Sequence, residues 1–140
     1  MIVIDASLVL RLLIDEPGSE EAQALWESWK TQRAIVSAPT LLIYEVANGL
    51  HQAFRQNVLT ERELTAALQA FVHFPVRYHD PLGLVPRAVE LSRELGLQAT
   101  YDSFYIALAE SLQGEFWTGD QKLYNHVHER IPFVKSLWAD

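Results

Sequence analysis

Hydrophobic and polar positions follow two different periods along the chain, and the two periods alternate. Short apolar runs are typical of buried strands and occupy residues 1–5, 34–37, 76–78, 115–118 and 133–134. Between them, apolar residues recur every three or four positions and predict helices over about 7–16, 20–30, 40–54, 60–73, 84–95, 101–114 and 120–127. Strands that alternate with helices predict an α/β fold whose parallel sheet is covered on both faces.

Residue types at the predicted helix ends support these boundaries. Ser7 is expected to cap the first helix, and Pro39 to open the third. Thr60 and Glu63 have the spacing of a capping box, in which each side chain accepts a hydrogen bond from the backbone of the other. Gly96 is typical of the residue that directly follows a helix.

The composition is that of an ordinary folded protein, and we expect one domain over residues 1–140. Apolar residues make up 49% of the chain and charged residues 21%. No apolar run approaches the roughly 18 to 20 residues of a membrane span, and the chain does not begin with a secretory signal, so we expect a cytoplasmic protein. The absence of cysteine excludes disulfides and thiolate metal sites.

The net charge of −7 argues against a broad, non-specific nucleic-acid binder, because phosphate binding favours a basic surface. It leaves room for a small substrate channel with its own metal, since carboxylates gathered around a cation no longer add to the surface charge. A glycine-rich phosphate loop, a Gly-x-Ser-x-Gly elbow and a dinucleotide fingerprint are all absent from the sequence. The candidates for chemistry are therefore acidic residues.

Four acidic residues stand out by their positions. Asp5 ends the first strand and is the only charged residue in 1–10, while Asp120 follows strand 115–118 and a glycine. Glu45 is the only Asp, Glu, Lys or Arg in 34–54, and Asp102 is the only one in 95–109. Buried carboxylates without a partner are costly, and a shared cation is the simplest compensation.

Geometry favours the same interpretation, because ligands of parallel α/β sheets bind where the strands end. Asp5 and Asp120 both follow strands at that edge, and Asp102 lies at a helix start, whose dipole stabilises the ionised carboxylate. Oxygen ligands suit hard ions such as Mg²⁺ or Mn²⁺. Such ions activate water for attack on a phosphodiester. Ser7 and Thr118, each two residues from a carboxylate, are candidates to orient it or a metal-bound water.

Three of the four acidic residues have a ready structural explanation, and Asp5, at a strand end, is the least easily explained in this way. Asp102 could cap a helix, and Asp120 could be a turn residue after Gly119. Glu45 lies away from the apolar stripe of its predicted helix, which favours a solvated position, although the start of that helix is apolar all round. That stripe is formed by Ile43, Val46, Ala47, Leu50 and Phe54. The structural explanations are individually reasonable and jointly improbable.

Four segments around these residues resemble the motifs of PIN-domain ribonucleases, in order and over essentially the whole chain. They are Val3-Ile4-Asp5-Ala6-Ser7, Tyr44-Glu45-Val46-Ala47-Asn48, Asp102-Ser103-Phe104-Tyr105-Ile106-Ala107-Leu108-Ala109 and Trp117-Thr118-Gly119-Asp120-Gln121-Lys122-Leu123. In size and layout the chain is most similar to VapC-like toxins of toxin–antitoxin pairs. Gly119 stands where relatives often have alanine.

The resemblance implies a three-layer α/β/α fold with a parallel sheet in the order 3-2-1-4-5. It implies Mg²⁺- or Mn²⁺-dependent endonucleolytic cleavage of an RNA substrate, a homodimer, and inhibition by a cognate antitoxin. Asp5, Glu45, Asp102 and Asp120 would be the catalytic metal-site residues, supported by Ser7 and Thr118.

Two alternatives remain open at this point. The same site could belong to an RNA-processing or DNA-directed nuclease that has no antitoxin. A non-catalytic interaction module could instead keep the fold and use its apolar surface, given the number of aromatic residues on two of the predicted helices. These are Trp26, Trp29, Tyr101, Phe104 and Tyr105.

Overall fold

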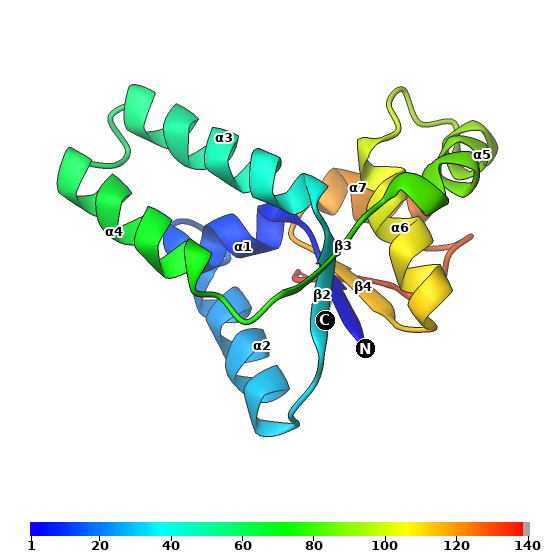
Figure 1. Cartoon of the computed structure of the whole chain (residues 1–140), viewed down its shortest axis with the longest axis horizontal. Helices are drawn as coiled ribbons and strands as arrows, with labels where there is room; N and C mark the ends of the chain where they lie inside the picture. Colours follow the sequence, from blue (N-terminus) through cyan, green and yellow to red (C-terminus); the bar gives the residue numbers. More distant parts are fainter. Residues whose placement is uncertain (139–140) are drawn as a thin grey trace.

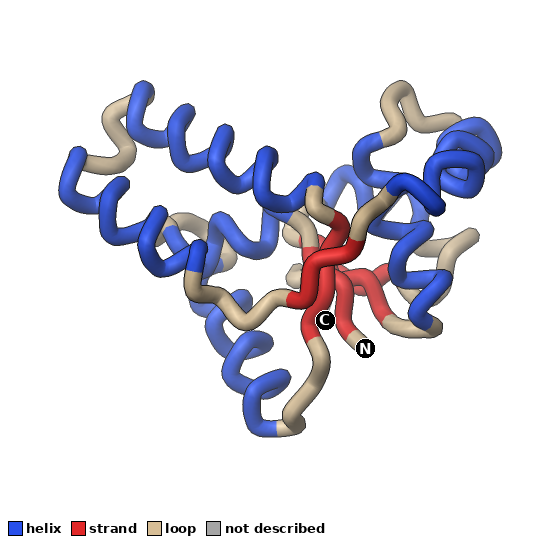
Figure 2. The backbone as a smooth tube through the Cα atoms, in the orientation of Figure 1, coloured by secondary structure: helices blue, strands red, loops and turns tan. Residues whose placement is uncertain are grey.

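The computed structural model describes residues 1–138, and its centre is a five-stranded parallel sheet (Figures 1 and 2). The strands lie in the order β3-β2-β1-β4-β5, as the resemblance implied, and all neighbouring pairs are parallel. Their bounds are Ile2–Ile4 for β1, Val36–Pro39 for β2, Arg77–His79 for β3, Glu115–Thr118 for β4 and Val134–Ser136 for β5.

Helices cover both faces of the sheet, which confirms the predicted three-layer α/β/α architecture. Figure 1 shows α1 to α4 on one side of the strands, with α3 and α4 as a long hairpin, and α5 and α6 on the other. The helices are α1 (Ala6–Leu13), α2 (Ser19–Thr31), α3 (Leu41–Arg55), α4 (Glu61–Val72), α5 (Val85–Leu95), α6 (Tyr101–Leu112) and α7 (Gln121–Val127), with a short 3₁₀ turn, η1 (Leu82–Leu84), before α5. None of the helices in residues 1–138 has the length and apolar character to cross a membrane.

The central strand β1 is buried on both faces, as a continuous apolar run predicts. Helix α6 contacts β1, β2 and β4, and its Tyr105 stacks on Phe116 of β4 with ring centroids 5.7 Å apart. Both aromatic side chains are fully buried. This packing fixes α6 against the sheet close to the carboxyl ends of β1 and β4.

The register of β1 and β4 decides which residues meet at that edge. Ile4 pairs with Trp117, so the next residues along the two strands, Asp5 and Thr118, lie side by side. A helix begins within three residues of the end of each strand, α1 after β1 and α7 after β4. The carboxyl ends of neighbouring parallel strands thus bring together residues more than 100 positions apart in sequence.

Three local predictions were wrong. Asp5, not Ser7, caps α1, because its carboxylate accepts a hydrogen bond from the Leu8 N–H, whereas Ser7 lies inside the helix. Pro39 ends β2 instead of opening α3, since the adjoining Thr40 N–H continues the sheet pairing to the His79 carbonyl. The buried stripe of α3 differs from the predicted one and consists of Leu42, Val46, Leu50 and Ala53. The capping box of Thr60 and Glu63 and the left-handed Gly96 after α5 are confirmed.

Candidate active site

Asp5 is the most firmly held of the four predicted carboxylates. It is 5% exposed, and it accepts hydrogen bonds from the Ser7 hydroxyl (2.6 Å), the Thr118 hydroxyl (2.5 Å) and the Leu8 N–H (3.1 Å). Burial raises the pKa of Asp5 to about 6, although these three hydrogen bonds oppose the shift and the charge of Asp120 adds to it. The carboxylate is therefore fixed in place but poorly compensated in charge.

Ser7 and Thr118 lie where the sequence predicted supporting hydroxyls, and they join the two strand ends. The Ser7 hydroxyl accepts a hydrogen bond from the Gly119 N–H at 2.8 Å, and the Thr118 hydroxyl accepts one from the Asp120 N–H at 3.0 Å. Each hydroxyl thus donates to Asp5 and accepts from the turn that carries Asp120. This network ties the position of the Asp120 backbone to that of the Asp5 carboxylate.

Asp120 caps α7, with its carboxylate accepting a hydrogen bond from the Leu123 N–H at 3.0 Å. The structural role of Asp120 is therefore that of a helix cap, whereas the structural explanation given above was a turn residue after Gly119. It is also the most exposed of the four carboxylates. Because one carboxylate oxygen is enough for the cap, the cap role leaves the other free for a ligand.

Asp102 lies in the first turn of α6 but does not cap it, because Thr100 is the capping position. Within residues 1–138, its carboxylate has no hydrogen-bond or salt-bridge partner. Burial, followed by the negative charges of Asp5 and Asp120, raises the pKa of Asp102 to about 6. The cap interpretation is wrong here, and the unpaired carboxylate faces two others.

Glu45 approaches the same region from α3. It lies next to the buried Leu42 and Val46 and is half-buried, so the unfavourable wheel position followed from the wrong apolar stripe. The Tyr105 hydroxyl donates a hydrogen bond of 2.5 Å to its carboxylate. Burial raises the pKa of Glu45, this hydrogen bond opposes the shift, and the charge of Asp102 adds to it.

Tyr105 is the residue at this site that sequence reasoning missed, because it was counted only among the apolar aromatic residues. Burial and the Glu45 carboxylate both raise its pKa, so the phenol remains protonated and acts as a donor. Its spacing from Asp102 was a usable signal, since residues three apart share a helix face. Helix α6 thus carries one carboxylate and positions a second.

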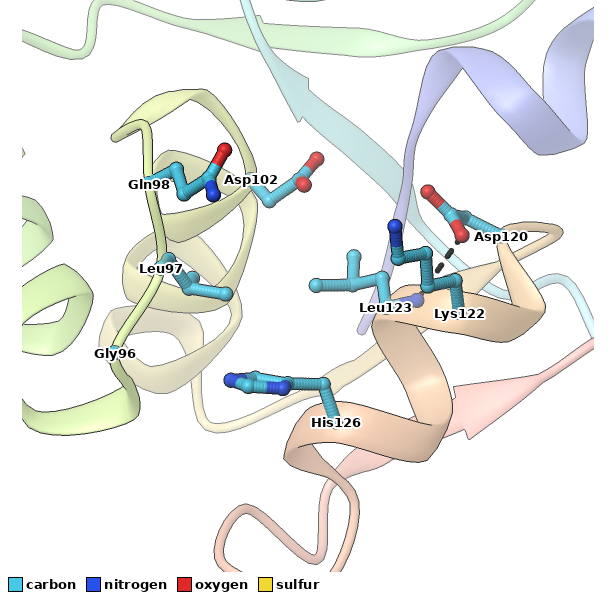
Figure 3. Close-up of a pocket in the computed structure, with 8 residues that line it drawn as sticks. All are labelled: Gly96, Leu97, Gln98, Asp102, Asp120, Lys122, Leu123 and His126. Atoms are coloured by element: carbon cyan, nitrogen blue, oxygen red, sulfur yellow. Dashed lines mark hydrogen bonds between the residues drawn. The ribbon is translucent and has the colours of Figure 1, made fainter.

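A cavity of about 320 Å³ opens between Asp102 and Asp120. Figure 3 shows the two carboxylates on opposite sides of it, with the Lys122 side chain directed toward the space between them. Arg11, the other basic residue near the site in sequence, instead donates hydrogen bonds to the carbonyls of Ser7 (2.7 Å) and Pro17 (3.0 Å). Arg11 therefore supports the turn before α2, and Lys122 is the cation that lines the cavity.

The chemistry of these groups suits a hard divalent cation. Asp5, Glu45, Asp102 and Asp120 offer only oxygen donors, which Mg²⁺ and Mn²⁺ prefer. Burial raises the pKa values of Asp5 and Asp102, and the repulsion between carboxylates adds to this shift, so a nearby cation would favour the ionised forms. Within residues 1–138, however, no three His, Asp or Glu side chains form a group already arranged to hold one ion. The donors fit in type, and side-chain rotation would have to complete the arrangement.

Comparison with known protein families matches residues 2–128 to the PIN domain. The chain belongs to the PIN-domain family. Among curated relatives, Ribonuclease VapC3 of Pyrobaculum aerophilum is 32% identical over 124 residues, which cover 87% of this chain and 91% of the relative. Ribonuclease VapC9 of Mycobacterium tuberculosis is 31% identical over 134 residues, covering 96% and 97%.

Solved structures support the same fold. A toxin–antitoxin complex from Klebsiella pneumoniae contains a chain that superposes with a TM-score of 0.71 at 17% identity, and the match covers 100% of both chains. At that identity the likeness concerns the fold alone. The PIN-domain resemblance seen in the four sequence segments is confirmed over nearly the full length of the chain.

Proposed function

We propose that this PIN-domain protein is a metal-dependent endoribonuclease that acts as the toxin of a toxin–antitoxin pair. The observation that carries the proposal is the convergence of Asp5, Asp102 and Asp120 at one sheet edge, where their charges act on one another and none of the three forms a salt bridge within residues 1–138. Relatives of nearly equal length are named VapC ribonucleases, which supports RNA as the substrate.

Asp5, Asp102 and Asp120, with Glu45, would hold Mg²⁺ or Mn²⁺. Such an ion supplies an activated water and stabilises negative charge that develops at a phosphodiester. The residues of the chain supply the rest. Ser7 and Thr118 keep the Asp5 carboxylate in one orientation. Tyr105 orients Glu45, whose raised pKa makes it a better proton acceptor than an ordinary glutamate.

A cleavage assay tests the enzymatic part of the proposal. The purified protein is incubated with structured RNA such as transfer RNA in Mg²⁺, in Mn²⁺ and in excess chelator. We expect cleavage in the presence of either ion and none in chelator. An Asp120→Asn variant should lose cleavage while retaining its fold, because the substitution removes charge and leaves an oxygen that can still cap α7. RNA cleavage that is unaffected by chelator would contradict the proposed metal dependence.

The toxin role has its own test, because an RNA-processing or DNA-directed nuclease could use the same carboxylates. A small neighbouring reading frame that encodes a DNA-binding motif and a helical tail would favour a toxin, and its product should bind and inhibit this chain. We propose the cytoplasm as the site of action, since that is where such a toxin meets RNA. A homodimer is also proposed from the family resemblance, and light scattering of the purified protein would test it.

The non-catalytic alternative receives less support. Trp26, Trp29 and Tyr105 are buried, so most of the aromatic residues that suggested an interaction surface belong to the core. Phe104 is partly exposed, and Tyr101 has 59% of its surface exposed. Calorimetric titration with Mn²⁺ separates the two hypotheses, because a pure binding module should take up no metal.

A further inference from the structure

The cavity between Asp102 and Asp120 extends away from the carboxylates, into a space that the proposed hydrolysis does not need. It runs between the loop that follows α5 and the exposed side of α7 (Figure 3). Its volume of about 320 Å³ lies at the small end of ligand-binding cavities, which is room for one nucleotide unit and not for a duplex. A substrate held at the carboxylates would place a neighbouring nucleotide here.

The far part of the cavity has apolar, well-supported walls. Leu97 and Leu123 face it from opposite sides, and Leu123 is anchored in the core. The His126 ring forms the end wall and is held by a 2.6 Å contact between its Nε2 and the Leu95 carbonyl oxygen. A fixed imidazole ring can stack on the face of an unstacked base, and the two leucine side chains can contact it by apolar packing.

The near part of the cavity is polar. Lys122 directs its ammonium group toward the space between the two aspartates, and it forms none of the salt bridges within residues 1–138. Gln98 points into the cavity from the α5–α6 loop, and its amide has no hydrogen-bond partner in the same part of the chain. An amide can both donate to and accept from the edge of a base, and an ammonium group attracts phosphate.

We propose that this cavity is a subsite for one unpaired nucleotide next to the scissile phosphate, which rests on the proposed ribonuclease function. Leu97, Leu123 and His126 contact the base, Gln98 reads its edge, and Lys122 binds the adjoining phosphate. A base can enter this subsite only when it is unpaired. The subsite makes the cleavage position depend on the base beside the cut.

Substrate changes and protein changes, combined in pairs, test the proposal. The cleavage position of the wild-type protein is first mapped on a short single-stranded RNA. The nucleotide on each side of the cut is then made abasic in turn, and kcat/KM is measured for wild type, Gln98→Ala and Lys122→Met. Lys30→Met on α2 and Gln69→Ala on α4 are matched controls, since both residues are exposed and lie outside the cavity.

We expect one abasic position, and not the other, to lower the wild-type kcat/KM by about tenfold or more, as loss of a stacked base does. Gln98→Ala should lower kcat/KM on intact RNA but respond less to that abasic position, because the lost contact is the same. Lys122→Met should lower kcat/KM by the same factor for the intact and the abasic RNA. The control variants should behave as wild type.

Three results would overturn the inference. If the wild-type protein tolerates both abasic positions, no base is bound in the cavity. If Gln98→Ala and wild type lose the same factor at the sensitive position, the base is held elsewhere. If Lys122→Met cleaves both substrates at the wild-type rate, no phosphate is bound there. Failure of the wild-type protein to cleave intact RNA would instead remove the proposed function, and the subsite with it.

Discussion

The candidate site has two halves that are built differently. The strand half comes from the ends of β1 and β4, where Asp5 is buried and accepts three hydrogen bonds. The helix half comes from α3 and α6, where Glu45 accepts one hydrogen bond from Tyr105 and Asp102 accepts none within residues 1–138. The first half is a connected network, and the second is a pair of loosely held carboxylates.

This difference follows from how the two halves are supported. Strand ends are fixed by backbone pairing. Because Ile4 pairs with Trp117, the next residues along the two strands, Asp5 and Thr118, lie next to each other. Glu45 and Asp102 instead reach the site from two helices whose separation depends on packing. A rigid half that presents one ligand and an adjustable half that completes the coordination would suit a site that takes up a cation on demand.

The largest expected effect is on catalysis, and both halves should share it. Asp5→Asn and Asp102→Asn should each lower RNA cleavage by on the order of a thousandfold, because each removes a charge from the proposed metal site. Asp15→Asn, at an exposed position after α1, is the matched control and should cleave normally. Substantial cleavage by either site variant would limit the active site to the other half.

The second prediction concerns stability without metal, and it distinguishes the halves. Burial raises the pKa of Asp5 from 3.8 to about 6, so the folded state binds the proton more tightly than the unfolded state. Between these pH values the folded protein therefore loses stability as pH rises, and the loss is complete above the folded pKa. From about pH 4 to about pH 7 the cost from Asp5 is roughly 2 kcal/mol.

Chemical denaturation in the presence of chelator tests whether stability falls as pH rises. The unfolding free energy of wild type relative to Asp5→Asn should fall between those pH values, and Mn²⁺ should restore it at neutral pH. The unfolding free energy of wild type relative to Asp102→Asn should also fall as pH rises, but by less, because Asp102 is less deeply buried than Asp5. A wild-type protein that gains stability relative to Asp5→Asn as pH rises would show that Asp5 is not an uncompensated buried charge.

The third prediction removes the one hydrogen bond of the helix half. Tyr105→Phe keeps the ring that stacks on Phe116 and loses only the hydroxyl that contacts Glu45. We expect kcat to fall by about 10- to 100-fold, with little change in KM, as happens when a partner that orients a metal-site residue is lost. Tyr101→Phe, exposed on the same helix, is the control. Unchanged kcat in Tyr105→Phe would mean that Glu45 needs no positioning.

The same contrast between the halves explains what could be predicted from sequence. Alternating periods placed every strand and α-helix close to its observed position. Isolation in sequence marked Asp5, Glu45 and Asp102, and the end of a strand marked Asp120. Asp5 as the cap of α1 was missed because capping depends on backbone angles that Ser7, an equally good capping type, could also have adopted. The side of α3 that faces the core was also missed, since Ile43 and Leu42 are interchangeable by hydropathy and only packing separates them.

Contacts between helices that are distant in sequence could not be predicted either, because they also depend on how the helices pack. Tyr105 and Glu45 are 60 residues apart, and their contact depends on the angle between α3 and α6. Ser7 and Thr118, by contrast, could be placed near Asp5 and Asp120 because strand ends in a parallel sheet share an edge. The strand half was thus largely predictable, whereas the helix half required the structure.

The smallest predicted effect tests how tightly the strand half is packed. A Cβ atom added at Gly119 would lie 2.7 Å from Arg11 Nη1 and 3.2 Å from the Ser7 carbonyl oxygen. Gly119→Ala should therefore cost about 1 kcal/mol of unfolding free energy as Arg11 is displaced from the Ser7 carbonyl. In an Arg11→Met background the same substitution should cost much less, because the guanidinium no longer fills that space. Denaturant melts of the four proteins give the coupling directly. If the two substitutions are additive, Arg11 does not enforce glycine at 119, and the strand half is less tightly packed than the contrast with the helix half requires.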